Sequence, residues 1–397
     1  MAADGRTPPS RDIDVRLFVP LMAHSVAVHA IVSLARVTIT YRAIELDLSV
    51  VWIGVIAAGF SLMPVFVAVQ VGRYIDRGHD SVAAWIGAVL VLAACVGLWL
   101  WPLSAGYLLA LSILLGVGHL FCMAAHQMLA VRCAGPRSRE AVFGHFMIAI
   151  AIGQGLGPTA LGLLGGSSAL PPTGMLFAVC VAGAVASLVI AFALRPARAA
   201  KPRREEGQVV PVAALLRLQG LVVALWASVM TVTAFELLVI YLPLLGTERQ
   251  IDTRDIGLLL AVRSLVSIFS RIFYVRLIDV VGRVRLMVAC ILTGAIAFLL
   301  LGVAMPLTVV YVAVAAMGFG LGIAATLTFS EVVRLAPSQA RATALSLRIT
   351  GNRLGQVLLP FLASVVATAT GVGGVFVITA AMLAASGLAV RVSLRGR

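Results

Sequence analysis

Residues 153–158 read Gly-Gln-Gly-Leu-Gly-Pro, and residues 355–360 read Gly-Gln-Val-Leu-Leu-Pro. The two stretches are 202 residues apart, and each lies within a long apolar run. Further pairs at a shift of 202 or 203 are Gly116 with Gly318, Arg132 with Arg334, Gly54 with Gly257, and Asp76 with Asp279. Matches at a nearly constant shift over several runs indicate that the chain contains two copies of one unit.

The composition places both copies in a membrane. Of the 397 residues, 61% are hydrophobic and 12% are charged, whereas an ordinary soluble domain is about 25% charged. A soluble protein cannot bury that much apolar surface, so the natural solvent of this chain is lipid. The composition excludes a soluble enzyme, a disordered chain and a nucleic-acid-binding domain.

Twelve apolar runs are long enough to cross a bilayer. They occupy residues 17–40, 50–70, 82–103, 106–131, 141–165, 173–194, 218–245, 256–275, 285–304, 306–331, 342–367 and 371–391. Because the runs are continuously apolar rather than alternating, they predict helices and exclude a β-barrel. The predicted organisation is a tail (1–15), a six-span bundle (16–194), a linker (195–217), a second six-span bundle (218–391) and a tail (392–397).

The basic residues fall mainly on one side of the predicted membrane. With the N-terminus inside, 23 of the 30 Lys and Arg residues lie in internal tails and connections, and 3 lie outside. Cytoplasmic connections of membrane proteins carry this excess. We therefore expect a multi-pass protein of a bacterial cytoplasmic (inner) membrane, with both termini and the linker in the cytoplasm. The net charge of +14 is thus a feature of topology, and no nucleic-acid partner is expected.

The cysteines and histidines show no pattern typical of a cofactor. The five cysteines occur singly, and the six histidines include no His-Glu-x-x-His spacing. This argues against a disulfide framework and a zinc site. We expect no metal and no cofactor, and we expect the chain to act as a monomer in the lipid bilayer.

The connection after the second run resembles a known signature. Residues 72–79 read Gly-Arg-Tyr-Ile-Asp-Arg-Gly-His, and residues 276–283 repeat the Asp, Gly and Arg. These stretches resemble the G-x-L-a-D-R-x-G-R-R signature of the major facilitator superfamily. Gly153-x-x-x-Gly157-Pro158 resembles the G-x-x-x-G-P-x-x-G-G motif of its 12-span drug/proton antiporters. The resemblance covers about residues 16–392 and implies an all-α membrane fold of two pseudo-symmetric six-helix bundles.

The sequence departs from the family patterns at three places. His79 and Asp80 stand where the signature has small and basic residues. Ser112 replaces an arginine that is frequent in the fourth span, and Leu161 replaces a late glycine in the fifth. These departures weaken the antiporter assignment and the usual account of proton coupling.

The resemblance also implies gating residues. Asp76 and Arg77 would contact the start of the eleventh span, near Arg341, and close the cytoplasmic side; Asp279 and Arg139 would form the mirror contact. Gly153, Gly157 and Pro158 would bend the fifth span, pack it against the eighth and control leak. The alternatives are solvated loop charges for the first group and ordinary helix packing for the second.

Glu236 is the acidic residue deepest within a predicted span. A carboxylate at that depth must be neutralised or paired, so it is the first candidate for proton coupling. The repeat at a shift of 200 places Arg36 opposite it, so the alternative is a structural ion pair. His29 and His119 are further candidates for proton coupling because histidine titrates near neutral pH, although packing is an alternative role for both.

Arginines and amides form a polar stripe in the second half. Arg348, Asn352 and Gln356 follow one another at intervals of four residues, so they share a helix face. Such a stripe should face a cavity or another helix rather than lipid. With Arg36 and Arg263 they are the predicted residues of the substrate cavity, and arginines favour an anionic substrate. The alternative is pairing with backbone carbonyls or with Glu236.

Three classes of function compete. The favoured one is a proton-coupled secondary transporter that exports small amphipathic or drug-like molecules by alternating access, as the Gly157-Pro158 motif indicates. The second is a proton symporter or uniporter that imports a small metabolite such as an organic anion, which the intramembrane arginines favour. The third is a membrane enzyme that uses the histidines, but no nucleophile elbow, phosphate loop or paired catalytic carboxylates accompany them.

Overall fold

The structure, a computed structural model, describes residues 13–100, 104–135, 138–195, 212–337 and 340–394, with the backbone alone at 139–140, 212 and 341–342. The first half contains α1 (Val15–Glu45), α2 (Val50–Asp76), α3 (Asp80–Leu100), α4 (Ala105–Cys133), α5 (Arg139–Leu164) and α6 (Thr173–Ala191). The second half contains α7 (Val212–Leu216), α8 (Leu221–Glu248), α9 (Thr253–Val281), α10 (Arg283–Gly302), α11 (Leu307–Leu335) and α12 (Arg341–Leu394). Eleven of these described helices are long and apolar enough to cross a membrane.

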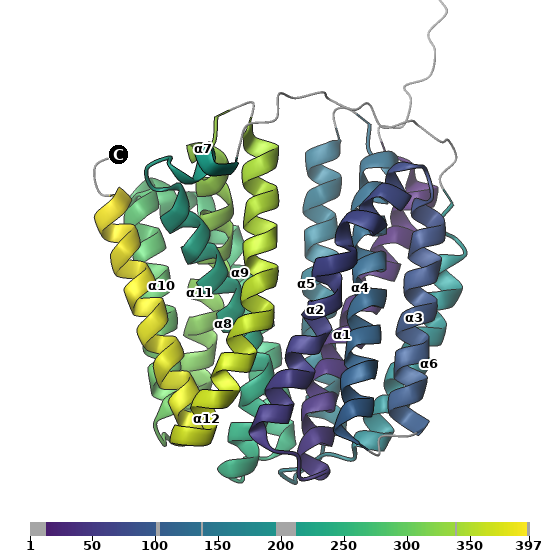
Figure 1. The fold of residues 1–397 in the computed structure, drawn as a ribbon, viewed down its shortest axis with the longest axis vertical. Helices are drawn as coiled ribbons and strands as arrows, with labels where there is room; N and C mark the ends of the chain where they lie inside the picture. The colour runs from purple at the N-terminus through teal and green to yellow at the C-terminus, as the bar shows by residue number, and fades with distance from the viewer. Residues whose placement is uncertain (1–12, 101–103, 136–137, 196–211, 338–339, 395–397) are drawn as a thin grey trace, which may run out of the picture.

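The last helix, α12, provides two spans. Gly371 interrupts it with φ 74° and ψ 172°, a conformation that glycine adopts readily because it has no Cβ. Its two arms, 341–370 and 372–394, meet at the lower end of the molecule in Figure 1. With α1–α6 and α8–α11, the described chain has twelve spans, and the arms correspond to the predicted runs 342–367 and 371–391. The predicted all-α membrane fold is confirmed.

The apolar runs fold as helices because a helix satisfies its own backbone N–H and C=O groups, which lipid cannot do. Polar side chains mark some of the ends. The Asp14 carboxylate accepts a hydrogen bond from the Arg16 N–H at 3.1 Å, before α1. The Ser104 hydroxyl accepts one from the Tyr107 N–H at 3.3 Å, before α4. Such caps replace the bonds that the first turn of a helix lacks.

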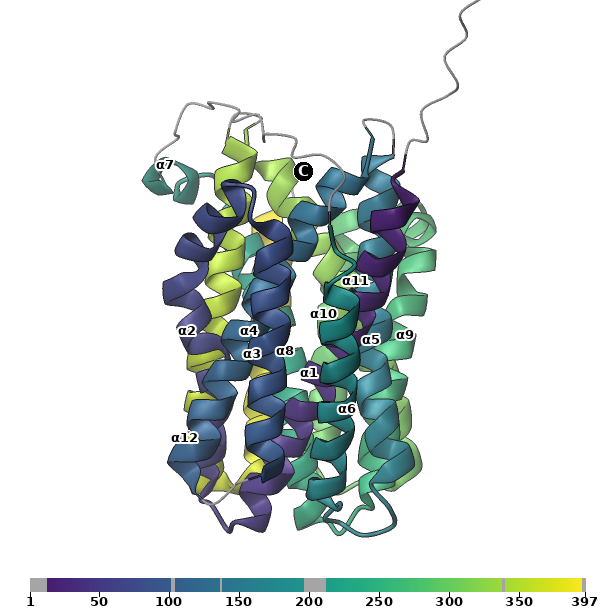
Figure 2. The same cartoon turned by 90° about the vertical axis from the view of Figure 1, so that its right-hand side faces the viewer.

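The two halves form two bundles side by side. In Figure 1 the first half lies on the right and the second on the left, and Figure 2 shows the first half from its side. The short helix α7, the beginning of α1 and the end of α12 lie at one end of the molecule (Figure 1), which we call the α7 end. The opposite end is called the far end.

Close helix contacts join the bundles toward the far end. A Cβ added at Gly257 on α9 would collide with Gly162 on α5 and lie 2.8 Å from the Pro158 carbonyl oxygen. In the same way, a Cβ at Gly54 on α2 would lie 2.9 Å from the Pro360 carbonyl oxygen on α12. Gly54 and Gly257 are repeat partners, as are Pro158 and Pro360. The repeat therefore builds two equivalent crossings that hold the halves together.

Loop hydrogen bonds reinforce this contact. The Thr253 hydroxyl donates to the Ser168 carbonyl oxygen at 2.8 Å. The Arg254 N–H donates to the Gly166 carbonyl oxygen at 3.2 Å. Both bonds lie at the far end, where α5 ends and α9 begins, so this end of the molecule is closed.

Candidate functional site

A central cavity of about 450 Å³ lies between the two bundles. Helices α1, α2, α4 and α5 line it from the first half, and α8, α9, α11 and α12 line it from the second. Its residues nearer the α7 end include the exposed Gln127, Arg271 and Ile349. Arg36 and Glu236, toward the far end, are only 15% and 19% exposed. The cavity therefore opens toward the α7 end.

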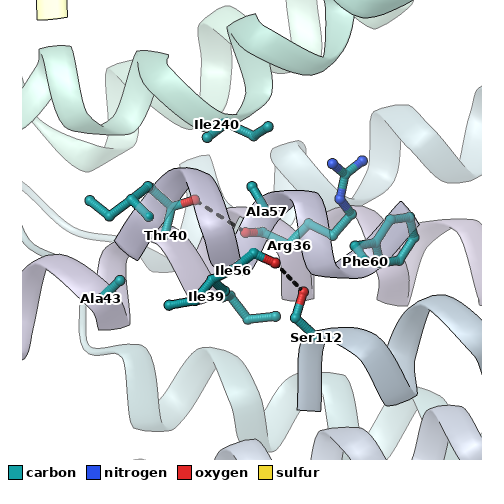
Figure 3. Close-up of a pocket in the computed structure, with 10 residues that line it drawn as sticks. Arg36, Ile39, Thr40, Ala43, Ile56, Ala57, Phe60, Ser112 and Ile240 are labelled. Carbon is teal, nitrogen blue, oxygen red and sulfur yellow. Dashed lines mark hydrogen bonds between the residues drawn. The ribbon is translucent and has the colours of Figure 1, made fainter. Parts of the chain in front are cut away.

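An ion pair closes the inner end of this cavity. Arg36 on α1 and Glu236 on α8 approach to 2.5 Å between Nη2 and Oε2. The pair joins the two halves, and the repeat register that places Arg36 opposite Glu236 is reproduced in three dimensions. Beyond it, toward the far end, lies an apolar void of about 20 Å³, which has room for about one water molecule. Figure 3 shows Arg36 at the edge of this void with its guanidinium group beside Phe60, 4.4 Å from the ring centroid.

An amide extends the ion pair onto α12. Gln356 donates from Nε2 to Oε1 of Glu236 at 3.2 Å. Arg353 donates from Nη1 to Oε1 of Gln356 at 3.3 Å. Arg36, Glu236, Gln356 and Arg353 thus form one network across the cavity. Arg353 is absent from the predicted cavity set, although its place one residue after Asn352 could have indicated it.

The remaining predicted cavity residues divide into two groups. Arg263 and Asn352 line the cavity, and Asn352 accepts a hydrogen bond from the Ser228 hydroxyl at 3.2 Å. Arg348, in contrast, is not among the residues that line the cavity; its guanidinium group lies 5.3 Å from the ring centroid of Phe329 on α11. The helical stripe therefore turns partly away from the cavity, and Arg348 contacts α11 instead.

The intramembrane histidines form two pairs. His29 and His119 line the cavity, with 3.5 Å between their Nε2 atoms. His29 Nδ1 lies 2.7 Å from the Ser25 carbonyl oxygen. Because a carbonyl oxygen only accepts, the proton of neutral His29 is on Nδ1, and its Nε2 can accept from His119. His29 and His119 thus join α1 to α4 at the wall of the cavity, and their role in proton coupling stays a prediction.

The second histidine pair is buried away from solvent. His24 Nδ1 lies 2.6 Å from His126 Nε2, and both rings are 0% exposed. The Ser25 hydroxyl donates to the Leu21 carbonyl oxygen and lies 3.3 Å from His126 Nδ1. This arrangement assigns Nδ1–H to both rings and tightly joins α1 to α4.

Helix α5 packs against α9, the eighth span, as predicted, but the two glycines of its motif face α1. A Cβ at Gly153 would lie 2.5 Å from the Val26 carbonyl oxygen, and one at Gly157 would lie 2.6 Å from the Ala30 carbonyl oxygen. Both glycines thus face α1. The Pro158 carbonyl faces α9, the eighth span, at Gly257. The contact with the eighth span that the family resemblance implies is therefore made at Pro158. The two glycines join α5 to α1, because small residues allow two helix backbones to approach.

We expect Gly157→Val to destabilise the protein. The added side chain meets the α1 backbone, and such overpacking costs about 1–3 kcal/mol. Thermal unfolding of the purified protein measures the loss. Gly144→Ala on the same helix is the control, because nothing lies within 4 Å of its added Cβ. An unchanged midpoint in Gly157→Val would show that the contact is not tight.

The predicted gating charges lie apart from the cavity. Asp76 and Arg77 are exposed at the α7 end of α2, and Asp279 is exposed near the end of α9. Neither carboxylate forms an ion pair with a described side chain. The side chains of Arg139 and Arg341 lie outside the described ones, so both predicted latches stay predictions.

We expect Asp76→Asn to slow transport without preventing membrane insertion. A carboxylate at a helix N-terminus contributes about 0.3–1 kcal/mol, which corresponds to a roughly two- to fivefold change in rate. Flux measured in proteoliposomes, normalised to inserted protein, tests this. Wild-type flux in the folded variant would show that Asp76 has no gating role.

Two ion pairs that involve buried carboxylates were not predicted. Asp80, at the start of α3, is 1% exposed and approaches Arg132 on α4 to 2.6 Å. In the second half Glu331 is 0% exposed and pairs with Arg334 at 2.5 Å. Arg132 and Arg334 are repeat partners. Its pairing with Arg132 explains why Asp80 stands where the signature has a basic residue. The spacing of Asp80 and Arg132 in the sequence gave no signal for this pair.

Two similar six-helix bundles around a central cavity, closed at one end, define a membrane transporter. The sequence matches the model of the Major Facilitator Superfamily over residues 21–252 and 224–397. The chain belongs to this superfamily. A search of curated protein sequences gave no match.

Solved transporters share the fold at low sequence identity. A mutant of the nucleoside transporter NupG has a TM-score of 0.80 at 12% identity, over 95% of this chain and 99% of that one. A D-xylose-proton symporter has a TM-score of 0.75 at 14% identity, over 94% and 97%. A bacterial homologue of the human lysosomal transporter Spinster, inward-facing and unoccupied, has a TM-score of 0.74 at 14% identity, over 96% and 98%. At these identities the comparison shows the fold alone.

Proposed function

We propose that the protein is a proton-coupled secondary transporter that exports small amphipathic molecules by alternating access. The observation that carries this proposal is the Arg36–Glu236 pair, which joins the two halves at the closed end of the cavity. Phe60, Phe235 and Val239 supply apolar walls beside these charges. Because both halves of the cavity come from one chain, a monomer suffices.

The ion pair supplies a mechanism for coupling. In the present state Arg36 supplies the counter-charge of the Glu236 carboxylate. When the halves separate at the far end, the pair breaks and the carboxylate can take up a proton. When they close again, Arg36 returns and the proton leaves into the cavity, which His29 and His119 line. Protonation thereby favours one state over the other, as coupling requires.

The α7 end is proposed to face the cytoplasm of a bacterial inner membrane. The excess of basic residues on that side supports this orientation, which makes the present state open to the inside. An Arg203→Cys variant of the cysteine-free protein should react with an impermeant thiol reagent only from the cytoplasmic side. Labelling from the outside in intact cells would show that the protein has the opposite orientation.

The direction of transport is tested in proteoliposomes. With the protein inserted and a pH gradient imposed, export predicts that cargo moves against the proton flow, whereas symport predicts that both move together. The Gly157-Pro158 pair supports export. Symport is the alternative, because the fold is shared with a D-xylose-proton symporter. No gradient-driven flux with any cargo would contradict secondary transport.

A further inference from the structure

The charges that line the cavity do not balance. Arg36, Arg263, Arg271 and Arg353 line it, and Glu236 is the one carboxylate among its described lining residues. Glu236 pairs with Arg36. The other three guanidinium groups thus have no carboxylate partner among the described side chains. Arg271 is exposed, but Arg263 and Arg353 are more enclosed, and an unpaired charge in a poorly solvated site is costly. The excess of cations at these two residues indicates a ligand that supplies the missing charge.

Arg263 on α9 is the most enclosed of these cations, at 9% exposed. Its Nη2 donates to the Ser264 hydroxyl oxygen at 2.7 Å, and that hydroxyl in turn donates to the Leu260 carbonyl oxygen at 3.0 Å. Its Nε is buried without a hydrogen-bond partner. Its guanidinium group lies 4.9 Å from the ring centroid of Phe235, which supports the charge without using its N–H groups. The guanidinium group of Arg263 is thus held in place, and its Nε–H remains without a hydrogen-bond partner.

Arg353 on α12 is held in a similar way. Its Nη1 donates to Gln356 at 3.3 Å, and Gln356 is in turn fixed by its own hydrogen bond to Glu236. The contact with an amide orients the arginine but gives it no ion pair among the described side chains. Arg263 and Arg353 therefore present two oriented cations to one cavity.

We propose that the cargo is an organic anion with an apolar body, whose carboxylate binds Arg263 and Arg353. The inference rests on the proposed function, since it identifies the cargo of that same cavity. A guanidinium fork matches a carboxylate with two charge-assisted hydrogen bonds. Phe60, Phe235 and Val239 supply surfaces for the apolar body, and about 450 Å³ is within the usual range for small organic ligands. A cationic cargo would meet three unpaired arginines, and a neutral one would leave them unpaired.

Calorimetric titration of the purified full-length protein in detergent tests this inference. The probes are benzoate and octanoate, their neutral amides benzamide and octanamide, and the cation benzylammonium. We expect each anion to bind at least about tenfold more tightly than its amide, because the amide leaves buried donors and charge uncompensated. Arg263→Gln and Arg353→Gln should each weaken benzoate binding about tenfold. Arg285→Gln, at an exposed position on α10 outside the cavity, is the matched control and should leave it unchanged.

Equal affinities for anions and amides, or tighter binding of benzylammonium, would overturn the proposal. Unchanged benzoate binding in both cavity variants would do so too. If Arg263→Gln does not fold, as judged by gel filtration, Arg353→Gln decides the outcome. Flux in proteoliposomes separates the two proposals. If only neutral cargo accumulates under a pH gradient, the anion site is refuted but the transporter function stands. If benzoate binding depends on the arginines but no gradient-driven flux is seen, the anion site stands and proton coupling is refuted.

Discussion

Replacing Glu236 with glutamine should abolish transport driven by a pH gradient while leaving cargo binding measurable. Glutamine cannot ionise, so Arg36 loses its partner and the cavity loses the carboxylate that is proposed to take up the proton. We expect gradient-driven flux in proteoliposomes to fall by more than about tenfold, as for a residue required in the coupled step. Exchange of labelled cargo without a gradient should persist, because the cavity and its other lining residues remain.

The double variant Glu236→Gln with Arg36→Gln distinguishes coupling from structure. It removes both charges of the pair, so the loss of Glu236 leaves no unpaired charge at position 36. If Glu236 serves only as half of a structural pair, this variant should recover thermal stability and gradient-driven flux together, and such a recovery would contradict coupling by Glu236. If coupling requires the carboxylate, stability recovers and flux does not. His29 and His119 would be the next candidates after a negative result.

Asp80→Asn should produce the largest loss of stability. Asp80 is 1% exposed and Arg132 is 6% exposed, so the substitution leaves a buried guanidinium group without a counter-charge. Breaking a buried pair from one side costs about 3–5 kcal/mol. We expect a lower thermal unfolding midpoint and separation of α3 from α4 at the α7 end.

A second variant shows whether the charge itself is responsible. In Asp80→Asn combined with Arg132→Gln no ion remains unpaired, so much of the lost stability should return. Asp47→Asn is the matched control, because Asp47 forms no ion pair with a described side chain and its φ of 52° is one that asparagine tolerates. Equal midpoints for Asp80→Asn and the wild type would mean that the pair contributes nothing.

Much of the fold follows from the sequence because lipid imposes a simple rule. An apolar run of sufficient length must form a helix, so the runs alone predict the spans. Their repetition at a shift of about 202 residues predicts two related bundles. The repeat even placed Arg36 opposite Glu236, since equivalent positions on α1 and α8 face the same central axis.

The tertiary structure decided which neighbours each polar residue meets. Arg348 and Arg353 are five residues apart on one helix, yet only Arg353 lines the cavity. The rotation of α12 depends on its packing against other helices, chiefly α8, α2 and α10. Asp80 is in sequence a loop charge, but the approach of α3 to α4 makes it half of a buried pair.

Gly153 and Gly157 also show that the sequence does not identify the neighbours of a residue. Their spacing predicts a close helix contact but does not name α1 as the partner. The sequence thus determined which segments cross the membrane and where charge is too costly to leave unpaired. Only the tertiary structure decided which charges meet, because helix rotation and crossing depend on side-chain packing between segments that are far apart in the chain.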